Sequence, residues 1–475
     1  MADTVDRIRQ AVVKVFTQSD APDYDQPWQT EGVVSSAGSG LVVSTARGPR
    51  VLTNAHVVEN QVFIEVRRYG KPTKYVAEVE GAGHDCDLAL LTVEGNGFFR
   101  GATPIPIGEL PMLGNHVTVL GYPIGGDRLS LTQGIVSRIE MAQYAHSQRR
   151  LLSVQIDAAI NAGNSGGPVV GDDGRLVGVA FQALDEGENI GYVIGSPVVR
   201  RFLSDLDDGT FDGFPDIGIV TQPLGSQSHR GALGLPARLH GGLLVADVVY
   251  GGSAWRCLRR GDVLLKIGRS PVASDGTVNF RKGERIHYSH VVAQRQMGQS
   301  LTVEFWRGGK ARQCDIRLKP PRRLVPEDRY DVKPTYFVHA GLLFVPLTRD
   351  YLKTWGSEWW SSAPAKLQSI YENQIRTSTR REVVLLQKVL ADRVNQGYHE
   401  MESQVVVRVQ GKRIRRLSEL IRIVGAAKAR FLRFDFDDRT SIVLDRSLAA
   451  QRHEAILKRF GIPHDRSEDL RKMRQ

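Results

Sequence analysis

The chain has 475 residues, of which 41% are hydrophobic and 24% charged, values typical of a soluble globular protein. This length predicts about three domains. No apolar run reaches the roughly 18 residues of a membrane span, so none is expected. The first residues, MADTVDRIRQAVVKVF, lack the basic-then-apolar order of a secretory signal. Three cysteines, Cys86, Cys257 and Cys314, are too few and too scattered to predict a disulfide framework or a metal site, which favours a reducing, cytoplasmic compartment.

The net charge of +11 is distributed unevenly. Residues 1–213 carry 17 Lys+Arg against 26 Asp+Glu, whereas residues 214–475 carry 46 against 26. The basic part is compatible with a nucleic-acid or other acidic partner, with attraction between the two parts, or with a basic surface. No compact basic and aromatic motif accompanies the charge, so nucleic acid is not expected as a partner. The tryptophans at 355, 359 and 360 could stack on bases, but core or subunit packing is the preferred interpretation.

Residues 1–210 are predicted to form a β domain. QVFIEV alternates apolar and polar residues, and HVTVLGYPI, LLSVQI and LVGVAFQAL are β-branched runs bounded by Gly, Pro and Asp. Many short strands with frequent turns indicate a barrel or a sandwich. Flanking helices are expected at Thr4–Phe16 and from Ser196 onward.

An acidic stretch at 204–216 and a proline-rich stretch at 319–334 predict domain boundaries. The segments that follow them repeat. IGIVTQPL at Ile217 is echoed by AGLLFVPL at Ala340, and VLLKIGRSPV is echoed later, in the same order, by VVVRVQGKRI. Two related α+β domains are therefore expected, at residues 214–320 and 333–475. Within the second, helices are expected at 379–394 and at 447–461, the latter ended by glycine and proline.

Three residues in the β domain fit a nucleophilic site. A serine hydroxyl needs an adjacent base, and the base needs a group that orients it. His56 ends the run VLTNAHVV, Asp87 directly precedes the apolar run LALLTV, and Ser165 lies in NAGNSGGPVV. Each has an ordinary alternative, as a structural histidine, a turn aspartate or a small residue in a tight turn. Together, in the order His, Asp, Ser of the chymotrypsin-type arrangement, they predict a catalytic triad.

The residues around Ser165 predict the rest of the site. The backbone N–H groups of Gly163 and Ser165, with Asn164 between them, are expected to form an oxyanion hole. Six residues before the serine, where basic-cleaving enzymes carry an acid, stands Ala159, followed by Ile160. With Ala180 and Phe181 as the other wall, a small apolar specificity pocket is expected.

Several motifs together resemble one family. TNAHVV, DCDLALL, GYPIGG, INAGNSGGP and ENIGYVI look like those of the HtrA, or Do-like, serine proteases. DGTVNFRKGERIHYSH, HAGLLFVPLTRDYL and FDFDDRTSIVLD resemble, more narrowly, the plant-type members with a second, divergent PDZ domain. The resemblance implies a multidomain protein: an all-β chymotrypsin-like double β-barrel at residues 1–210, followed by the two α+β PDZ-like domains.

The resemblance also implies function. It predicts an ATP-independent serine endopeptidase that degrades unfolded or damaged proteins as a trimer or a multiple of trimers, with no cofactor or metal. The peptide-binding loop of the first PDZ-like domain would fall on Ile217, Gly218 and Ile219, where backbone N–H groups capture a terminal carboxylate. The corresponding loop at 340–342 either holds subunits together or is a plain β-turn. The alternative is a resting or chaperone-like protein that needs a PDZ ligand for activation.

Overall fold

The computed structural model describes residues 2–95, 97–123, 126–161, 163–183 and 190–472. The chain divides into two compact units. The first unit contains Met1–Asp20 and Val33–Pro321, and the second contains Ala21–Gly32 and Arg322–Gln475. Each unit is described by itself below.

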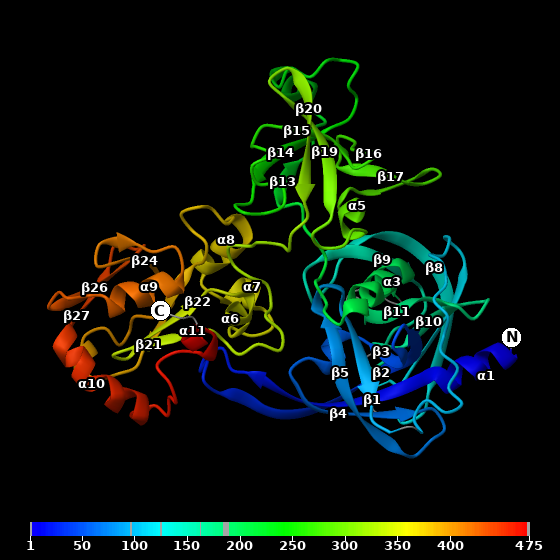
Figure 1. The fold of residues 1–475 in the computed structure, drawn as a ribbon, viewed down its shortest axis with the longest axis horizontal. Helices are drawn as coiled ribbons and strands as arrows, with labels where there is room; N and C mark the ends of the chain where they lie inside the picture. The colour runs from blue at the N-terminus through cyan, green and yellow to red at the C-terminus, as the bar shows by residue number, and fades with distance from the viewer. Residues whose placement is uncertain (1, 96, 124–125, 162, 184–189, 473–475) are drawn as a thin grey trace. The chain divides into compact units, whose positions relative to one another are not determined.

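Two closed six-stranded antiparallel barrels form the amino-terminal part of the first unit (Figure 1). The first barrel has the order β1-β2-β3-β6-β5-β4, with the bounds Val12–Pro22, Thr30–Thr45, Gly48–Thr53, Leu88–Val93, Lys74–Gly83 and Gln61–Arg68. The second has the order β10-β11-β12-β9-β8-β7, with the bounds Pro168–Gly171, Leu176–Ala183, Gly191–Gly195, Arg150–Ile156, Ser130–Gln143 and His116–Gly121. The β-branched runs form these strands because both their faces pack against apolar neighbours. The expected double β-barrel is confirmed.

The helices of the barrels agree with the sequence in part. Helix α3 (Ser196–Asp205) lies where expected, whereas α1 (Ala2–Ala11) is shorter than expected. The prediction of helix over Thr4–Phe16 is wrong in its second half, because Val13 and Val15 pair with β4 as part of strand β1. A short helix, α2 (Ala55–Val58), directly follows β3.

The first repeat forms a sheet of order β13-β14-β15-β19-β20. These strands are Ile219–Gln222, Leu243–Val248, Val263–Ile267, Ser300–Arg307 and Lys310–Arg317. The short strand β16 (Ser270–Pro271) pairs with β15 beside this path, and β17 (Thr277–Arg281) and β18 (Glu284–His287) form a separate hairpin. The helices are α4 (Gln227–Ala232) and α5 (Ser289–Ala293).

The second repeat has the same strand order with one strand added at its edge, β21-β22-β23-β24-β26-β27. These strands are Phe337–His339, Leu342–Pro346, Val384–Val389, Gln404–Val409, Phe431–Phe436 and Ser441–Asp445, and β25 (Lys412–Arg413) pairs with β24 as β16 does with β15. Its helices are α6 (Arg349–Lys353), α7 (Trp359–Ser362), α8 (Ala365–Asn373), α9 (Leu417–Gly425), α10 (Arg446–Arg459) and α11 (Glu468–Lys472). The internal repeat read from the sequence is therefore confirmed strand for strand.

One helix expected in the second repeat is a strand. Residues 379–394 contain β23, which lies between β22 and β24 and buries Val384, Leu385 and Leu386. A strand covered on both faces has a continuous apolar run, which periodicity cannot distinguish from a buried helix. The carboxy-terminal helix is confirmed as α10, where the Asp445 side chain accepts hydrogen bonds from the backbone N–H groups of Ser447 and Leu448.

A segment from between β1 and β2 belongs to the second unit. Trp28 packs edge-on against Tyr336, with ring centroids 5.9 Å apart. Asp25 forms an ion pair with Lys388 at 2.7 Å, and its carbonyl accepts a hydrogen bond from the Gln387 side chain at 2.8 Å. These polar contacts fix the segment on strand β23.

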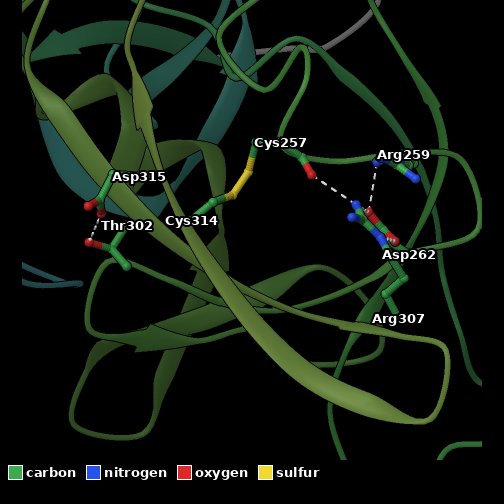
Figure 2. Close-up of a disulfide and its surroundings, with 7 residues drawn as sticks. All are labelled: Cys257, Arg259, Asp262, Thr302, Arg307, Cys314 and Asp315. Atoms are coloured by element: carbon green, nitrogen blue, oxygen red, sulfur yellow. Dashed lines mark hydrogen bonds and ion pairs between the residues drawn. A yellow bond between two sulfur atoms is a disulfide. The ribbon is translucent and has the colours of Figure 1, made fainter.

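Two of the three cysteines form a disulfide in the first repeat (Figure 2). It joins Cys257 to Cys314 on β20, with Cα atoms 6.3 Å apart. The sequence analysis expected no disulfide framework and did not foresee this single bond, because the sheet brings together residues 57 positions apart. Beside Cys257, Arg307 forms an ion pair with Asp262 at 2.6 Å. Cys86 is buried and free.

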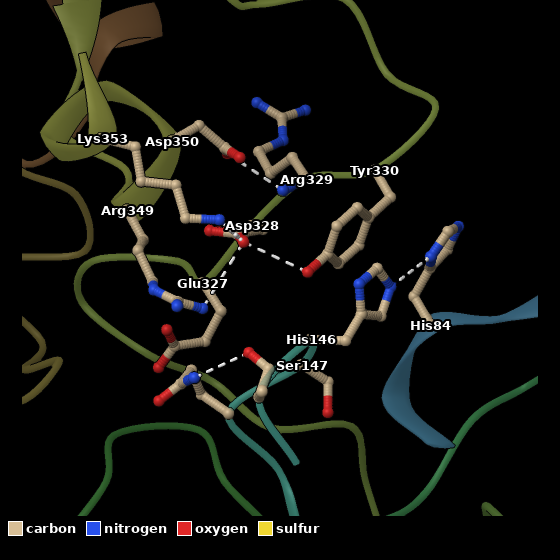
Figure 3. A network of polar contacts seen from close by, with 12 residues as sticks. His84, His146, Ser147, Glu327, Asp328, Arg329, Tyr330, Arg349, Asp350 and Lys353 are labelled. Carbon is tan, nitrogen blue, oxygen red and sulfur yellow. Dashed lines mark hydrogen bonds and ion pairs between the residues drawn. The ribbon is translucent and has the colours of Figure 1, made fainter. Parts of the chain in front are cut away.

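The second unit contains a half-buried acidic pair (Figure 3). Asp328 accepts hydrogen bonds from the Tyr330 hydroxyl at 3.1 Å and from Lys353, and pairs with Arg349 at 3.4 Å. Asp350 accepts a hydrogen bond from the backbone N–H of Arg329 at 2.9 Å. Burial, and then the neighbouring charge of Asp328, raises the pKa of Asp350 from its ordinary 3.8 to about 6.

The raised pKa predicts how the second unit responds to pH. The folded protein binds the Asp350 proton more tightly than the unfolded chain, so this contribution to stability is complete below about pH 4 and is lost as the pH rises through about 6. Asp350→Asn keeps an acceptor for Arg329 and should remove this dependence, worth up to about 3 kcal/mol. Thermal unfolding followed from pH 4 to 7 should be flatter in Asp350→Asn than in wild type. The exposed control Glu372→Gln should follow wild type; equal slopes in all three proteins would contradict the prediction.

Candidate active site

His56 and Asp87 are held together by the strand ends that carry them. His56 lies in α2 directly after β3, and Asp87 directly precedes β6, which pairs with β3. The Nδ1 atom of His56 lies 2.7 Å from Oδ2 of Asp87, and the backbone N–H of His56 donates to Oδ1 at 2.9 Å. The side chain of Asn54 donates to the backbone carbonyl of Asp87 at 2.7 Å. Both carboxylate oxygens of Asp87 are therefore engaged by His56, which fixes the imidazole ring.

The electrostatics of this pair favour a charged carboxylate beside the imidazole. Burial raises the pKa of the Asp87 carboxyl, but the charges of His56 and His146 and the hydrogen bonds from His56 bring it below its usual value. Burial lowers the pKa of His56, but the charge and hydrogen bond of Asp87 outweigh it, and the pKa lies above its usual 6.5. His56 is thus a stronger base than a free histidine, as proton abstraction from a serine requires.

Ser165 lies in a glycine-rich turn just before β10. Gly166 has a φ of +85°, and a Cβ at this position would lie 2.0 Å from the carbonyl oxygen of Ser39, so only glycine fits. The Ser165 hydroxyl donates a long hydrogen bond of 3.5 Å to the carbonyl of Phe181. Within the residues that the structure describes, it makes no hydrogen bond to His56.

Gly38 shows that the serine turn and the histidine helix are neighbours. A Cβ at Gly38 would lie 2.7 Å from both methyl groups of Val57 and 3.4 Å from the carbonyl oxygen of Ser165. The absence of a side chain at Gly38 therefore lets α2 of the first barrel approach the turn from the second barrel. This contact brings the elements that carry His56 and Ser165 together.

Ser39 supports the backbone of the turn that contains Gly163 and Ser165. Ser39 donates its hydroxyl to the carbonyl of Gly163 at 2.7 Å, and its own N–H donates to the carbonyl of Ser165 at 2.9 Å. In the described part of the chain, the N–H groups of Gly163 and Ser165 have no acceptor. The N–H of Asn164 instead donates to Asn161 at 2.9 Å, so Asn164 buttresses the turn. Sequence reasoning missed Ser39, which belongs to a distant strand.

The three residues proposed for the specificity pocket are apolar and buried. Ile160, Ala180 and Phe181 are 7%, 0% and 4% exposed. Gly191 faces Ile160, since a Cβ there would lie 2.7 Å from the isoleucine side chain. The ring of Phe181 packs on that of Tyr144, with centroids 4.5 Å apart. These residues therefore lie in an apolar environment, and sequence reasoning did not foresee the contact of Phe181 with Tyr144.

Two further histidines lie near the His56–Asp87 pair, and sequence reasoning assigned them no role. His84 and His146 share a hydrogen bond of 3.0 Å (Figure 3), and the His146 ring lies 6.0 Å from that of His56 between centroids. Glu59 lies 3.6 Å from the other ring nitrogen of His146. His84 is therefore half-buried, in contact with His146. Neither here nor elsewhere in the described residues does a group of three or more His, Cys, Asp or Glu have an arrangement that could hold a metal ion.

The predicted peptide loop of the first repeat has an open sheet edge. Ile217 is buried, Gly218 has a φ of +75°, and Ile219 begins β13, which within the described residues pairs only with β14. A Cβ at Gly218 would lie 3.2 Å from the Cα of Gly252, which explains the glycine. The N–H of Gly218 donates to the Asp216 carboxylate at 2.6 Å, so the loop already binds a carboxylate from its own chain.

The corresponding loop of the second repeat is closed. Ala340 and Gly341 have φ values of +50° and +87° and form a two-residue turn between β21 and β22. Strand β21 pairs with the edge of β22 that corresponds to the open edge of β13. Asn395 donates to the carbonyls of Ala340 and Leu390 at 2.9 and 2.8 Å, which holds this turn. The second repeat therefore supplies its own edge strand where a peptide would have to bind.

Arg149 connects the barrel to the first repeat. It donates to the carbonyls of Phe214 and Pro215 at 2.8 and 3.2 Å and lies 3.8 Å from Asp216. Asp85, two residues before Asp87, accepts the N–H of Phe214 at 3.0 Å and lies 4.0 Å from Arg149. A continuous set of polar contacts therefore runs from the peptide loop to the turn that carries Asp87.

Comparison with known proteins gives consistent matches. Residues 38–179 match the family described as trypsin-like peptidase domain, and residues 325–469 match the family described as PDZ domain. The chain is 40% identical to protease Do-like 2, chloroplastic, of Arabidopsis thaliana over 97% of its length and 75% of that protein. It is 36% identical to putative protease Do-like 3, mitochondrial, of the same plant over 99% of its length and 82% of that protein.

Solved structures agree. The HtrA-type protease AlgW with decapeptide matches with a TM-score of 0.52 and 25% identity, over 67% of this chain and 99% of that one. No helix in the described residues is long and apolar enough to cross a membrane.

The role of Ser39 is testable. Ser39→Ala removes the hydroxyl that supports Gly163 and accepts the N–H of Tyr122 at 2.7 Å. Loss of a buried hydrogen-bonding partner costs roughly 1–3 kcal/mol, which predicts a fall in kcat of about 5- to 150-fold. Peptide hydrolysis by Ser39→Ala should be compared with that of Ser36→Ala, an exposed serine on the same strand. Unchanged kcat in Ser39→Ala would show that the turn does not depend on this hydroxyl.

Proposed function

The chain belongs to the HtrA, or Do-like, family of trypsin-like serine proteases, and from this premise we propose that His56, Asp87 and Ser165 are its catalytic triad. The observation that carries the proposal is the contact of half-buried His56 with buried Asp87, whose two carboxylate oxygens are both engaged, next to the Ser165 turn across Gly38. Hydrolysis of peptide bonds is the family's activity, and the non-proteolytic alternative is not favoured by the comparisons.

In the proposed mechanism, His56 takes the proton of the Ser165 hydroxyl as its oxygen forms a bond to the carbonyl carbon of the scissile peptide. The carbonyl oxygen becomes an oxyanion, and the N–H groups of Gly163 and Ser165 donate to it. His56 then gives its proton to the leaving amine as the C–N bond breaks. A water molecule releases the acyl group by the same steps in reverse. Asp87 stays ionised throughout, orients the ring through Nδ1 and stabilises the imidazolium.

The proposed specificity follows from the pocket walls. Ile160, Ala180 and Phe181 offer no charge to a basic or acidic side chain, and Gly191 leaves little depth because Ile160 lies against it. An aliphatic residue before the cleaved bond fits this pocket best. Unfolded or damaged proteins expose such residues, so they are the proposed substrates, cleaved without ATP.

The first repeat is proposed as the module that binds peptide termini. Its edge strand β13 is open, whereas that of the second repeat is covered by β21. The carboxylate of a bound peptide would replace that of Asp216 at the N–H of Gly218. If the Asp216 side chain moved away, Arg149 would lose its ion pair with Asp216. Ile217, Gly218 and Ile219 are thus the proposed binding loop, and the polar contacts to Asp85 offer a route by which binding reaches the triad.

Assembly and compartment are proposed from the sequence and the family resemblance. A trimer or multiple of trimers is proposed from the family resemblance, with no nucleic acid as partner. A cytoplasmic location is proposed from the sequence alone; the Cys257–Cys314 bond and the relatives named as chloroplastic and mitochondrial proteins count against it.

The triad is tested by hydrolysis of casein without ATP. Wild type should cleave, and Ser165→Ala should not. Asp87→Asn should lower kcat by about 10⁴-fold, since the histidine tautomer is then wrong. Because Asp87 raises the pKa of His56, kcat/KM of wild type should fall to half its maximum on the acid side at a pH above 6.5. Activity that persists in Ser165→Ala would refute the mechanism, and cleavage sites that follow charged residues would refute the pocket.

Peptide binding is tested with a fluorescent decapeptide that ends in an apolar residue with a free carboxylate. Wild type should bind one peptide per chain, and an amidated peptide should bind weakly. Ile219→Glu places a negative charge at the loop and should abolish binding. Val220→Glu, the same change on the exposed next residue, should keep it. One full-affinity site remaining in Ile219→Glu would assign peptide binding to the second repeat.

A further inference from the structure

Asn54 occupies the position from which an asparagine ordinarily caps a helix. It directly precedes α2 and has an extended backbone, with φ of −79° and ψ of 151°. At such a position the side-chain oxygen usually accepts a hydrogen bond from an N–H group of the first helical turn. In the described part of the chain, the Asn54 side chain makes no capping hydrogen bond. Capping therefore does not explain this residue.

The Asn54 side chain instead reaches the residue that orients the imidazole ring. Its amide nitrogen donates to the backbone carbonyl of Asp87 at 2.7 Å, and the two residues are buried, with 0% and 1% exposed. The backbone pairing of β3 with β6 ends at Thr53 and Ala89. The amide thus extends the contact between the two strands as far as Asp87. Because a carbonyl oxygen can only accept, the group opposite it has to be a donor.

Asp87 in turn supplies the cap that Asn54 does not. Its Oδ1 atom accepts the backbone N–H of His56, the second residue of α2, at 2.9 Å. Its Oδ2 atom lies 2.7 Å from Nδ1 of His56. The two residues therefore form a reciprocal pair. The amide of Asn54 bonds to the backbone of Asp87, and the carboxylate of Asp87 bonds to a helix N–H that an asparagine cap could have taken.

The backbone of Asp87 requires support from its surroundings. It has a φ of +54° and a ψ of +44°, in the left-handed region that residues with a Cβ disfavour. Its N–H donates to the carbonyl of His84 at 3.2 Å, and its own carbonyl receives the Asn54 amide. Residues in this region keep their conformation only where surrounding contacts enforce it. The Asn54 amide is one of these contacts.

The second polar atom of the Asn54 amide argues against a purely stabilising role. Within the described residues, Oδ1 of Asn54 is buried and has no hydrogen-bond partner. A buried acceptor without a donor costs free energy. An apolar side chain of similar size would avoid this cost, so stability alone does not account for an amide here.

We propose that Asn54 is a positioning residue for the triad: its amide fixes the backbone of Asp87 so that one carboxylate orients the ring of His56. The proposal rests on the proposed triad and adds to it a residue that acts through Asp87 and does not touch substrate. Without the amide, the Asp87 carbonyl loses its donor and the left-handed turn relaxes. Both carboxylate contacts with His56 then lengthen.

Two variants separate positioning from capping. Asn54→Leu removes the donor and any capping oxygen at similar volume. Asn54→Ser keeps an equally good capping residue, but its hydroxyl is one bond shorter than the amide and falls short of the Asp87 carbonyl. In both variants, kcat for a fluorogenic peptide, counted per folded molecule, should fall by roughly 10- to 100-fold with KM unchanged, since a displacement of about 1 Å at a catalytic group has this effect.

The pH dependence of kcat/KM gives a readout that a loss of folded protein would not change. Burial lowers the pKa of His56, whereas the charge and hydrogen bond of Asp87 raise it. With Asp87 displaced, this pKa should fall, so the acid-side pH of half-maximal kcat/KM should be lower than in wild type. The other titratable groups that act on this pair are Glu59 and His146. Within the described residues, the Asn54 side chain hydrogen-bonds to neither.

Thr17→Val is the matched control. Thr17 is buried in the same barrel, and its hydroxyl donates to the backbone carbonyl of Val57 at 2.7 Å, a bond of the same kind. Thr17→Val should lower the thermal stability but keep the acid-side midpoint of wild type. An equal fall of this midpoint in Thr17→Val would show general loosening of α2 and overturn the proposal.

The remaining outcomes separate this proposal from the triad itself. Wild-type kcat in Asn54→Leu would overturn the positioning role, and wild-type kcat in Asn54→Ser alone would assign Asn54 to capping. Activity that persists in Ser165→Ala would refute the triad. An inactive Ser165→Ala beside fully active Asn54 variants would refute only the role of Asn54.

Discussion

The buried contact between His56 and Asp87 is the constraint on which the active site depends. A carboxylate with 1% of its side chain exposed stays charged only if its oxygens are satisfied, and His56 supplies both a ring nitrogen and a backbone N–H. This arrangement requires α2 to begin directly after β3 and Asp87 to directly precede β6, so the pairing of these two strands is part of the chemistry. Asp87 itself adopts a left-handed conformation, with φ of +54°, to turn its side chain toward His56.

Small residues let the second barrel complete the site. Gly38 admits Val57 and the Ser165 carbonyl, and Gly166 admits the Ser39 carbonyl. Ser39 then donates to Gly163 and positions the turn whose free N–H groups point to an oxyanion role. The same strand, β2, thus contacts both halves of the site, and a side chain at either glycine would push the two halves apart.

The two repeats have the same strand order but differ at one edge of the sheet. In each repeat, a glycine with positive φ, Gly218 or Gly341, precedes the first strand that the two repeats share. In the first repeat the edge is open, and the Asp216 carboxylate accepts the N–H of Gly218 in the proposed binding loop. In the second, a tight turn folds β21 onto that edge, so its backbone groups are already paired. The second repeat therefore has no open edge at the position where the first repeat has one.

The sequence by itself determined the double barrel, the repeat and the identity of the candidate triad, because these depend on local signals: β-branched runs, glycines in turns and the motifs around His56, Asp87 and Ser165. It did not determine whether residues 379–394 form a helix or a strand, since burial on both faces removes the period that separates the two. The sequence did not predict the contacts of Ser39 and Tyr144 or the Cys257–Cys314 bond. Each of them joins residues that only folding brings together. The open and closed peptide edges likewise follow from strand pairing, which similar loop sequences do not reveal. Only the tertiary structure decides such contacts, because hydrogen bonds and charge repulsion depend on distance in space and not along the chain.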